Sequence, residues 1–229
     1  MRVIDLPAAP GALSLDLDRT ALVVVDMQNA FASPGGTLDL AGIDVLPAHD
    51  VIANAALVCE AARRSGLPVV YLTIGYPGNL STAGGADSPN PKKELALCLM
   101  RERPELRGKL LTFGTWDFQI VDELTPRSAD TVIVKSRYSG FHATALDSFL
   151  RSRGIRNLLF VGIASNVCVE STIRDAYFLE YWPVLIEDAT MPAGSEEIQR
   201  ATVFNVQTFF GWVASSEDVA TALREAVTA

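Results

Sequence analysis

Two stretches of the sequence decide the expected fold: ADTVIVKSRYSGF at positions 129–141 and NLLFVGIASNVCVESTIRDA at positions 157–176. Each contains a short apolar run, 131–134 and 158–163, whose length and β-branched residues predict a buried parallel strand. Lys135 stands at the end of the first run, and Cys168 follows the second. Because ligands of open α/β sheets bind outside the carboxyl ends of the strands, we expect both side chains to face one crevice.

The rest of the chain continues this alternation of strands and helices. Apolar runs predict further strands at 20–26, 68–73, 183–187 and 212–214, with 131–134 as the central strand. Helical patterns cover 51–64, 92–101, 116–124, 143–153, 168–180, 196–210 and 217–227. Repeated strand–helix units with apolar strands predict a three-layer α/β/α, Rossmann-like fold whose mostly parallel sheet is covered on both faces.

No polar linker divides the pattern, so we expect a single domain over residues 1–229. Residues 1–19 are interpreted as an N-terminal arm, and 32–44 as a loop. Residues 74–91 are rich in Gly, Pro, Ser and Asn and are long for a connector, which is typical of a lid or binding loop.

Composition excludes several classes of partner. The net charge of −8 argues against nucleic acid or an anionic membrane, and no apolar run approaches the roughly 18 residues of a membrane span. The three cysteines form no CxxC pair, and no signal peptide is visible at the N-terminus. We therefore expect a reduced, cytoplasmic protein whose partner is a small molecule.

Asp26, Lys135 and Cys168 each stand at or just past the carboxyl end of an expected strand. At the start of a helix and beside a lysine, Cys168 is expected to be a thiolate nucleophile, with Asp26 carrying protons to and from the reactants. Such a group suits hydrolysis of a C–N bond at a carbonyl. Spacing alone leaves other interpretations open: a helix-capping Asp, a solvated Lys and a core Cys.

Three strings then carry a resemblance: VVVDMQNAF (23–31), KSRYSGF (135–141) and GIASNVCVESTIRDA (162–176). They resemble the isochorismatase-like cysteine hydrolases, and the resemblance runs from about residue 20 to about residue 220. Asp26, Lys135 and Cys168 match the catalytic Asp, Lys and Cys of that family. The resemblance implies a parallel six-stranded sheet of Rossmann-like order and a homo-oligomer, either a dimer or a tetramer.

Further strings, among them PGGTLDLAGIDV (34–45), GKLLTFGTWDFQIVDEL (108–124) and FNVQTFFGWV (204–213), are similar to the ureidoacrylate amidohydrolases within that family. This implies that Cys168 attacks a ureido carbonyl and forms a carbamoyl-enzyme. It also implies that Asp26 protonates the leaving nitrogen. A cis peptide bond between Ile163 and Ala164 would direct the Ala164 N–H, together with the Cys168 N–H, at the oxyanion.

The loop after the second strand departs from those enzymes. Where they carry an Asn-Gly-Trp string and a downstream Glu, this chain has Ile74-Gly75-Tyr76 and Thr82. A pocket that lacks these polar groups discriminates differently among substrates. Biuret or triuret therefore remains an alternative substrate, and an N-carbamoyl amino acid hydrolase or a nicotinamidase-like amidase is a further alternative.

Polar and aromatic neighbours of the motifs are candidates for substrate binding, although core packing is an equally good explanation of two of them, Phe31 and Trp116. The candidates are Asn29, Phe31, Tyr76, Trp116, Tyr138 and Phe141. Arg137 and Arg174 could pair with a substrate carboxylate. The two histidines, His49 and His142, have no third ligand at a suitable spacing, so no metal and no other cofactor are expected.

Overall fold

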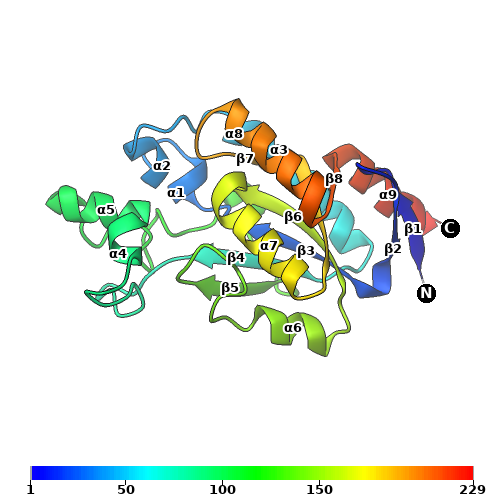
Figure 1. The fold of residues 1–229 in the computed structure, drawn as a ribbon, viewed down its shortest axis with the longest axis horizontal. Coiled ribbons are helices and arrows are strands. Elements are labelled where there is room, and N and C mark those ends of the chain that lie inside the picture. The colour runs from blue at the N-terminus through cyan, green and yellow to red at the C-terminus, as the bar shows by residue number, and fades with distance from the viewer. Residues whose placement is uncertain (1, 229) are drawn as a thin grey trace.

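A six-stranded parallel sheet forms the centre of the computed structural model, which describes residues 2–228 (Figure 1). Its strands are β3 (Thr20–Val25), β4 (Val69–Ile74), β5 (Thr131–Lys135), β6 (Asn157–Ile163), β7 (Trp182–Met191) and β8 (Trp212–Ala214). Their order in the sheet is β5-β4-β3-β6-β7-β8, and every pairing is parallel. This is the Rossmann order, in which the chain switches direction between β3 and β6. The expected three-layer fold is confirmed.

Helices cover both faces of this sheet. The α-helices are α1 (Asn29–Ala32), α2 (Thr37–Leu40), α3 (Ala48–Arg64), α4 (Asn90–Lys93), α5 (Leu95–Glu102), α6 (Leu146–Ser152), α7 (Glu170–Phe178), α8 (Glu196–Asn205) and α9 (Ser216–Thr228). Short 3-10 turns occur at Leu17–Arg19, Pro104–Leu106 and Asp122–Leu124, and π-helical turns at Ser165–Val169 and Val206–Phe210. α7 and α8 lie side by side across the face nearest the viewer in Figure 1, with α3 behind the sheet.

The core consists of two apolar clusters, one on each face of the sheet. Leu22 and Val24 of β3 belong to the cluster that includes α3 and α9, whereas Val23 and Val25 belong to the cluster that includes α6 and α7. Side chains alternate along a strand, so a strand covered on both faces must be apolar at every position. This explains the uninterrupted run of apolar residues in β3.

The expected N-terminal arm is in fact a β-hairpin. β1 (Val3–Leu6) pairs antiparallel with β2 (Leu13–Asp16), and Pro7, Pro10 and Gly11 lie in the connection. Alternate residues of both strands are buried, and the hairpin packs against α9, so that both termini lie at one end of the molecule (Figure 1).

The prediction of a helix at 116–124 is wrong. Only the 3-10 turn Asp122–Leu124 is helical, because the backbone of this segment pairs with the residues that follow β3. Asn29 N donates to Gln119 O, and Val121 N donates to Met27 O. Partners far away in sequence therefore take the hydrogen bonds that a local helix would use. Within 32–44, where only loop is expected, α2 forms a single helical turn.

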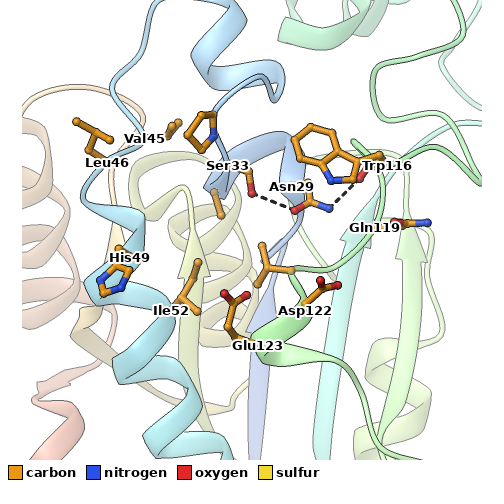
Figure 2. A pocket seen from close by; sticks show the side chains of 13 residues that line it. Asn29, Ser33, Val45, Leu46, His49, Ile52, Trp116, Gln119, Asp122 and Glu123 are labelled. Atoms are coloured by element: carbon orange, nitrogen blue, oxygen red, sulfur yellow. Dashed lines mark hydrogen bonds between the residues drawn. The ribbon is translucent and has the colours of Figure 1, made fainter.

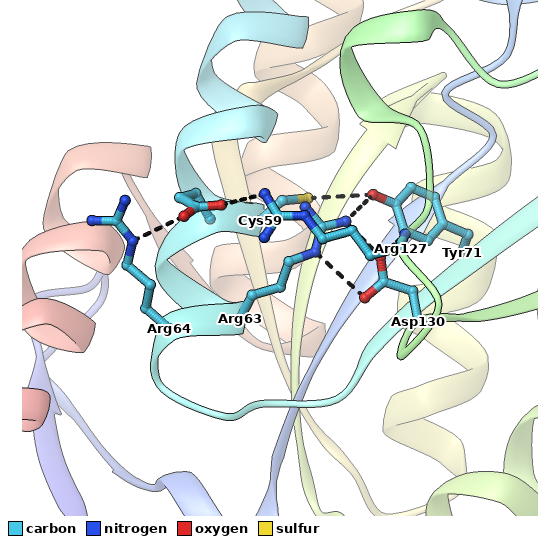
Figure 3. Close-up of polar contacts among 7 residues, drawn as sticks. Cys59, Arg63, Arg64, Tyr71, Arg127 and Asp130 are labelled. Carbon is cyan, nitrogen blue, oxygen red and sulfur yellow. Dashed lines mark hydrogen bonds and ion pairs between the residues drawn. The ribbon is translucent and has the colours of Figure 1, made fainter.

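β5 is an edge strand, not the central strand expected from the sequence. Val132 and Val134 are 48% and 46% exposed, so only one face of β5 is packed. A polar network anchors its beginning: Arg63 of α3 pairs with Asp130 at 2.6 Å and also donates to Tyr71 of β4 (Figure 3). The Tyr71 hydroxyl contacts Cys59, whose pKa burial raises to about 11. Cys59 is thus an inert core thiol, and the network helps to position the strand that ends in Lys135.

Candidate active site

Three side chains from three segments meet at the carboxyl edge of the sheet. Asp26 follows β3 directly, Lys135 is the last residue of β5, and Cys168 lies in the π-helical turn after β6. Lys135 Nζ donates a 2.6 Å hydrogen bond to Asp26 Oδ2, and Cys168 lies close enough to both for their charges to affect its pKa. β4 separates β3 from β5, so the long lysine side chain spans a backbone separation of about 10 Å. The structure thus brings together the three residues predicted from the strand ends.

The Asp26–Lys135 ion pair is withdrawn from solvent, because neither side chain has any exposed surface. Burial raises the pKa of Asp26, and the charge of Lys135 offsets only part of this effect. Burial opposes the charge of Lys135 as well, but Asp26 and Cys168 outweigh it and raise the lysine pKa. Asp26 Oδ1 is buried and accepts no hydrogen bond from any residue in the described part of the chain. One carboxylate oxygen is therefore available to a reactant.

The surroundings of Cys168 do not favour the expected thiolate. Burial raises its pKa well above the usual range, the charge of Asp26 raises it further, and Lys135 compensates only in part. α7 begins at Glu170, so Cys168 lies in the turn before the helix and not in its first turn. A thiol in this state becomes a nucleophile only when a neighbouring base accepts its proton.

Gln28 lies outside the set of residues predicted from the sequence, yet it organises the site. Its amide nitrogen donates to the carbonyls of Ile74 and Phe118, and its amide oxygen accepts from the N–H of Ile74. The side chain thereby joins the ends of β3 and β4 to the segment around Phe118. In the sequence, the feature that could have indicated this role is a glutamine two residues after the acid that ends a strand. A buried amide needs hydrogen-bond partners for both its oxygen and its nitrogen, so such a glutamine is expected to join neighbouring segments.

Two hydroxyl groups fix the segment that carries Cys168. Thr172 Oγ1 donates to Cys168 O at 2.6 Å and accepts from Gly140 N, which ties the start of α7 to the loop after Lys135. Ser165 donates to Gln199 of α8. Gly162 brings β6 close to β3, because a Cβ at this position would lie 2.0 Å from the Val25 carbonyl oxygen. The segment that carries Cys168 is thus held from several directions.

The peptide bond between Ile163 and Ala164 is cis, at the position that the family resemblance implies. The Ala164 carbonyl accepts hydrogen bonds from the N–H groups of Val167 and Val169, on either side of Cys168. Both hydrogen bonds of the turn thus end on one carbonyl oxygen, and Cys168 lies between the two residues that donate them. Ala164 and Cys168 are both buried.

Two predicted substrate-binding residues lie close to the three central side chains. Tyr138 packs against both apolar clusters, and burial raises its pKa to about 12, helped by the nearby Glu94 and Cys168. Tyr76 is fully buried, and its hydroxyl accepts from Asn90 Nδ2 and donates to Ser136 O. Both rings therefore belong to the wall between the long loop and the end of β5.

The other four candidates make different contacts. Asn29 and Trp116 line a surface cavity of about 510 Å³ that includes none of the three central residues, and Asn29 donates to the Trp116 carbonyl there (Figure 2). Phe31 is buried in the core. Phe141 packs against Tyr181 with a ring-centre separation of 5.6 Å.

Among residues 2–228, no three His, Cys, Asp or Glu side chains lie close enough together to hold a metal ion. His49 is exposed beside Asp50, and His142 is exposed after Phe141. In the same part of the chain, no helix has both the length and the apolar character needed to cross a membrane.

Comparison with known proteins agrees with this geometry. Residues 20–218 match the isochorismatase domain. The chain belongs to the isochorismatase family. One relative in this family, the ureidoacrylate amidohydrolase RutB of Pseudomonas syringae pv. syringae, is 56% identical over 95% of this chain and 89% of its own length.

Solved structures of the isochorismatase family share the fold. A cysteine hydrolase from Pseudomonas syringae pv. phaseolicola superposes with a TM-score of 0.78 at 26% identity, over 99% of both chains. N-carbamoylsarcosine amidase from Thermoplasma acidophilum superposes with a TM-score of 0.65 at 28% identity, over 87% of this chain and 97% of its own.

Replacing Lys135 with methionine should destabilise the fold, because it leaves the Asp26 carboxylate buried without its partner. We expect a loss of roughly 3–5 kcal/mol, measured by urea denaturation. The double replacement Asp26→Leu with Lys135→Met removes both charges and should recover most of this loss. A single variant as stable as the wild type would show that the ion pair is not buried in solution.

Alkylation of Cys168 should report its raised pKa. In the absence of substrate, the rate with iodoacetamide should still be rising at a pH where a small-molecule thiol, with a pKa of about 8.5, has reached its plateau. The alkylation rate rises with pH because it follows the fraction of thiolate, which stays low until the pH approaches the raised pKa of Cys168. Mass spectrometry distinguishes Cys168 from Cys59 and Cys98. A plateau below pH 7 would contradict the protonated resting state.

Proposed function

We propose that the protein is a cysteine-dependent amidohydrolase that cleaves the carbamoyl C–N bond of ureidoacrylate. The observation that carries this proposal is the buried group of Cys168, Asp26 and Lys135 at one edge of the sheet. The relative at 56% identity, a ureidoacrylate amidohydrolase, supplies the substrate class.

In the proposed reaction, Asp26 accepts the thiol proton as Cys168 attacks the ureido carbonyl carbon. The free oxygen of Asp26 supports this role, because it receives no hydrogen bond within the described residues. Lys135 keeps Asp26 ionised beforehand and holds its other oxygen at 2.6 Å. The tetrahedral oxyanion would accept hydrogen bonds from the Ala164 and Cys168 N–H groups, and one donor of this kind typically contributes about 10²–10³ in rate.

The remaining steps return the enzyme to its resting state. The oxyanion collapses, the C–N bond breaks, and Asp26 gives its proton to the leaving nitrogen, which departs as aminoacrylate. Asp26 then accepts a proton from water, whose oxygen attacks the carbamoyl carbon. Carbamate leaves, and the sulfur recovers a proton. No cofactor enters this scheme, and we expect a homo-oligomer in the cytoplasm.

The carboxylate of ureidoacrylate needs a cation, and Arg137 is suited to supply it. Its NH1 donates to the carbonyls of Thr82 and Ser136, and no carboxylate pairs with it within residues 2–228. The Arg137 carbonyl accepts from Lys135 Nζ at 3.2 Å, so the residue lies next to the catalytic group. Arg174, by contrast, is already paired with Glu170 at 2.6 Å. An arginine has five N–H donors, so the remaining ones could bind a carboxylate.

Biuret or triuret hydrolysis is the second candidate function. At the positions where ureidoacrylate enzymes carry an amide and an acid, this chain has Ile74, buried in the core, and Thr82, exposed on the long loop. Neutral ureido compounds present the same carbonyl to Cys168 and need no cation. The absence of the two polar side chains favours this alternative.

A panel of substrates tests the proposal. Purified protein is offered ureidoacrylate, biuret, triuret, an N-carbamoyl amino acid and nicotinamide, and the release of ammonia and carbon dioxide is measured. We expect the largest kcat/KM with ureidoacrylate, and Cys168→Ser should lose nearly all turnover because a serine hydroxyl is a poor nucleophile here. Turnover of nicotinamide alone would overturn the substrate class, and retained activity of Cys168→Ser would remove the cysteine from its role.

Replacing Arg137 with alanine should separate the two candidate functions. If the guanidinium binds the substrate carboxylate, KM for ureidoacrylate should rise at least about tenfold, the loss of a charged hydrogen bond of roughly 1.5–3 kcal/mol. KM for neutral biuret should change little. Arg137→Lys is the matched control, because it retains the charge but not the planar geometry, and it should recover part of the loss. Equal effects on both substrates would mean that Arg137 acts only by holding the loop.

A further inference from the structure

Seven aromatic side chains from the ends of α7 and α8, the π-helical turn after α8 and the starts of β7 and β8 form a continuous surface. Tyr177 contacts Phe178 and Phe210, Phe210 contacts Phe209, and Phe209 contacts Phe204, with ring-centre separations of 5.8–6.2 Å. Trp182 and Trp212 stack at 5.2 Å and border Tyr177 and Phe178. We call the set Tyr177, Phe178, Trp182, Phe204, Phe209 and Trp212, joined through Phe210, the aromatic surface.

The aromatic surface is strongly exposed. Phe178, Phe204 and Phe209 are 65%, 61% and 59% exposed, and Tyr177 and Trp182 are nearly half exposed. Since a large aromatic residue carries about 150–250 Å² of surface, these five present roughly 500 Å² of apolar area. That is more than half of the ~800 Å² that each partner buries in a standard interface, and it matches the size of a functional patch.

The aromatic surface has both a hollow and a projection. A groove of about 380 Å³ is lined by Tyr177, Phe178, Trp182 and Trp212. Phe204 at the end of α8 and Phe209 in the following π-helical turn stand beside it, and each is about 60% exposed. Phe210 contacts both Tyr177 in the groove and Phe209 in the projection, so groove and projection are contiguous.

We propose that the aromatic surface is the interface between two copies of this chain. The two copies are related by a two-fold axis, and Phe204 and Phe209 of each copy fill the groove of the other. A two-fold interface uses one patch on both subunits and must be complementary to itself. A patch that carries both a groove and an aromatic projection of similar chemistry meets this condition.

Charge also favours a second copy that meets at this face. The chain carries a net charge of −8, so two copies repel each other through most of their surfaces. The aromatic surface is mostly uncharged, with Glu180 as an acidic residue in the lining of its groove. At its centre, the guanidinium of Arg174 lies 4.2 Å from the Phe210 ring centre and is paired with Glu170, so the charge there is already compensated.

The interface would also support the segment that carries the nucleophile. Glu170, two residues after Cys168, accepts hydrogen bonds from Arg174 beneath the aromatic surface and from Thr202 and Asn205 of α8. Pairing two copies through α7 and α8 would hold these helices together where the active-site turn begins. This inference rests on the proposed homo-oligomer, and it is independent of which ureido compound is the substrate.

Light scattering after size-exclusion chromatography tests the assembly. Wild-type protein at micromolar concentration should have twice the chain mass of 24.6 kDa, or a higher even multiple. Phe209→Lys, in the projection, and Phe178→Asp, in the groove, should each halve the wild-type mass with an unchanged circular dichroism spectrum. Phe113→Asp is the matched control, because Phe113 is 44% exposed but lies outside the aromatic surface, and it should keep the wild-type mass.

Mixing the two variants tests the pairing itself. In a mixed dimer, one contact joins unmodified Phe209 to unmodified Phe178. The other contact joins the lysine introduced by Phe209→Lys to the aspartate introduced by Phe178→Asp, as an ion pair. We therefore expect the equimolar mixture to recover the wild-type mass, which neither variant reaches alone.

A monomeric wild-type protein, variants that keep the full mass, or a mixture that stays monomeric would each overturn the proposed interface. The hydrolysis assay is read separately, so a failure of the proposed reaction leaves these results interpretable.

Discussion

The structure depends on an ion pair that has no contact with water. Moving an aspartate and a lysine out of solvent costs several kcal/mol for each charge, and their mutual attraction repays this only when the geometry is good. Here the 2.6 Å contact between Lys135 and Asp26, with the Arg137 carbonyl as a further acceptor, supplies that geometry. The order of the strands makes it possible, because β5 delivers the lysine from two strands away and β3 delivers the acid at the centre of the sheet. The arrangement leaves one carboxylate oxygen of Asp26 buried and without a hydrogen bond from any described residue.

The same burial determines the state of the sulfur. A helix N-terminus stabilises a negative charge by about 0.3–1 kcal/mol, which is less than one unit of pKa. Burial and the neighbouring carboxylate raise the pKa of Cys168, and the charge of Lys135 offsets this effect only in part. A resting thiol is also less reactive towards oxidants and stray electrophiles. This agrees with the proposed reaction, in which proton transfer to Asp26, and not a permanent thiolate, produces the nucleophile.

Local sequence patterns predict the parts of this fold that depend on local burial. β3 and β6 are apolar at almost every position because both of their faces are covered, and the chemistry-bearing residues were predictable because strand ends converge at one edge. Segment 116–124 is not the predicted helix, because its backbone forms hydrogen bonds with residues 27–30. A local sequence pattern carries no information about such distant partners. The apolar run of β5 is short, and its composition does not show whether one face of the strand is covered or both. The sequence therefore could not distinguish an edge strand from a central one. The protonation of Cys168 depends on its depth in the fold, and the role of Gln28 depends on the loops that the fold brings around it.

In the proposed reaction, Asp26, Lys135 and Cys168 act only on the carbonyl carbon and the bond that breaks, so specificity must come from other residues. The neighbouring walls are Tyr76, Tyr138 and the long loop after β4. Arg137 donates to the Thr82 carbonyl in that loop while its own carbonyl accepts from Lys135. One residue thus joins the loop to the catalytic lysine. If the remaining donors of Arg137 bind a substrate carboxylate, the same guanidinium contacts both the substrate and the loop. Substrate binding and the position of the loop would then be coupled. An enzyme built this way can change its substrate through the loop sequence while the buried ion pair stays the same.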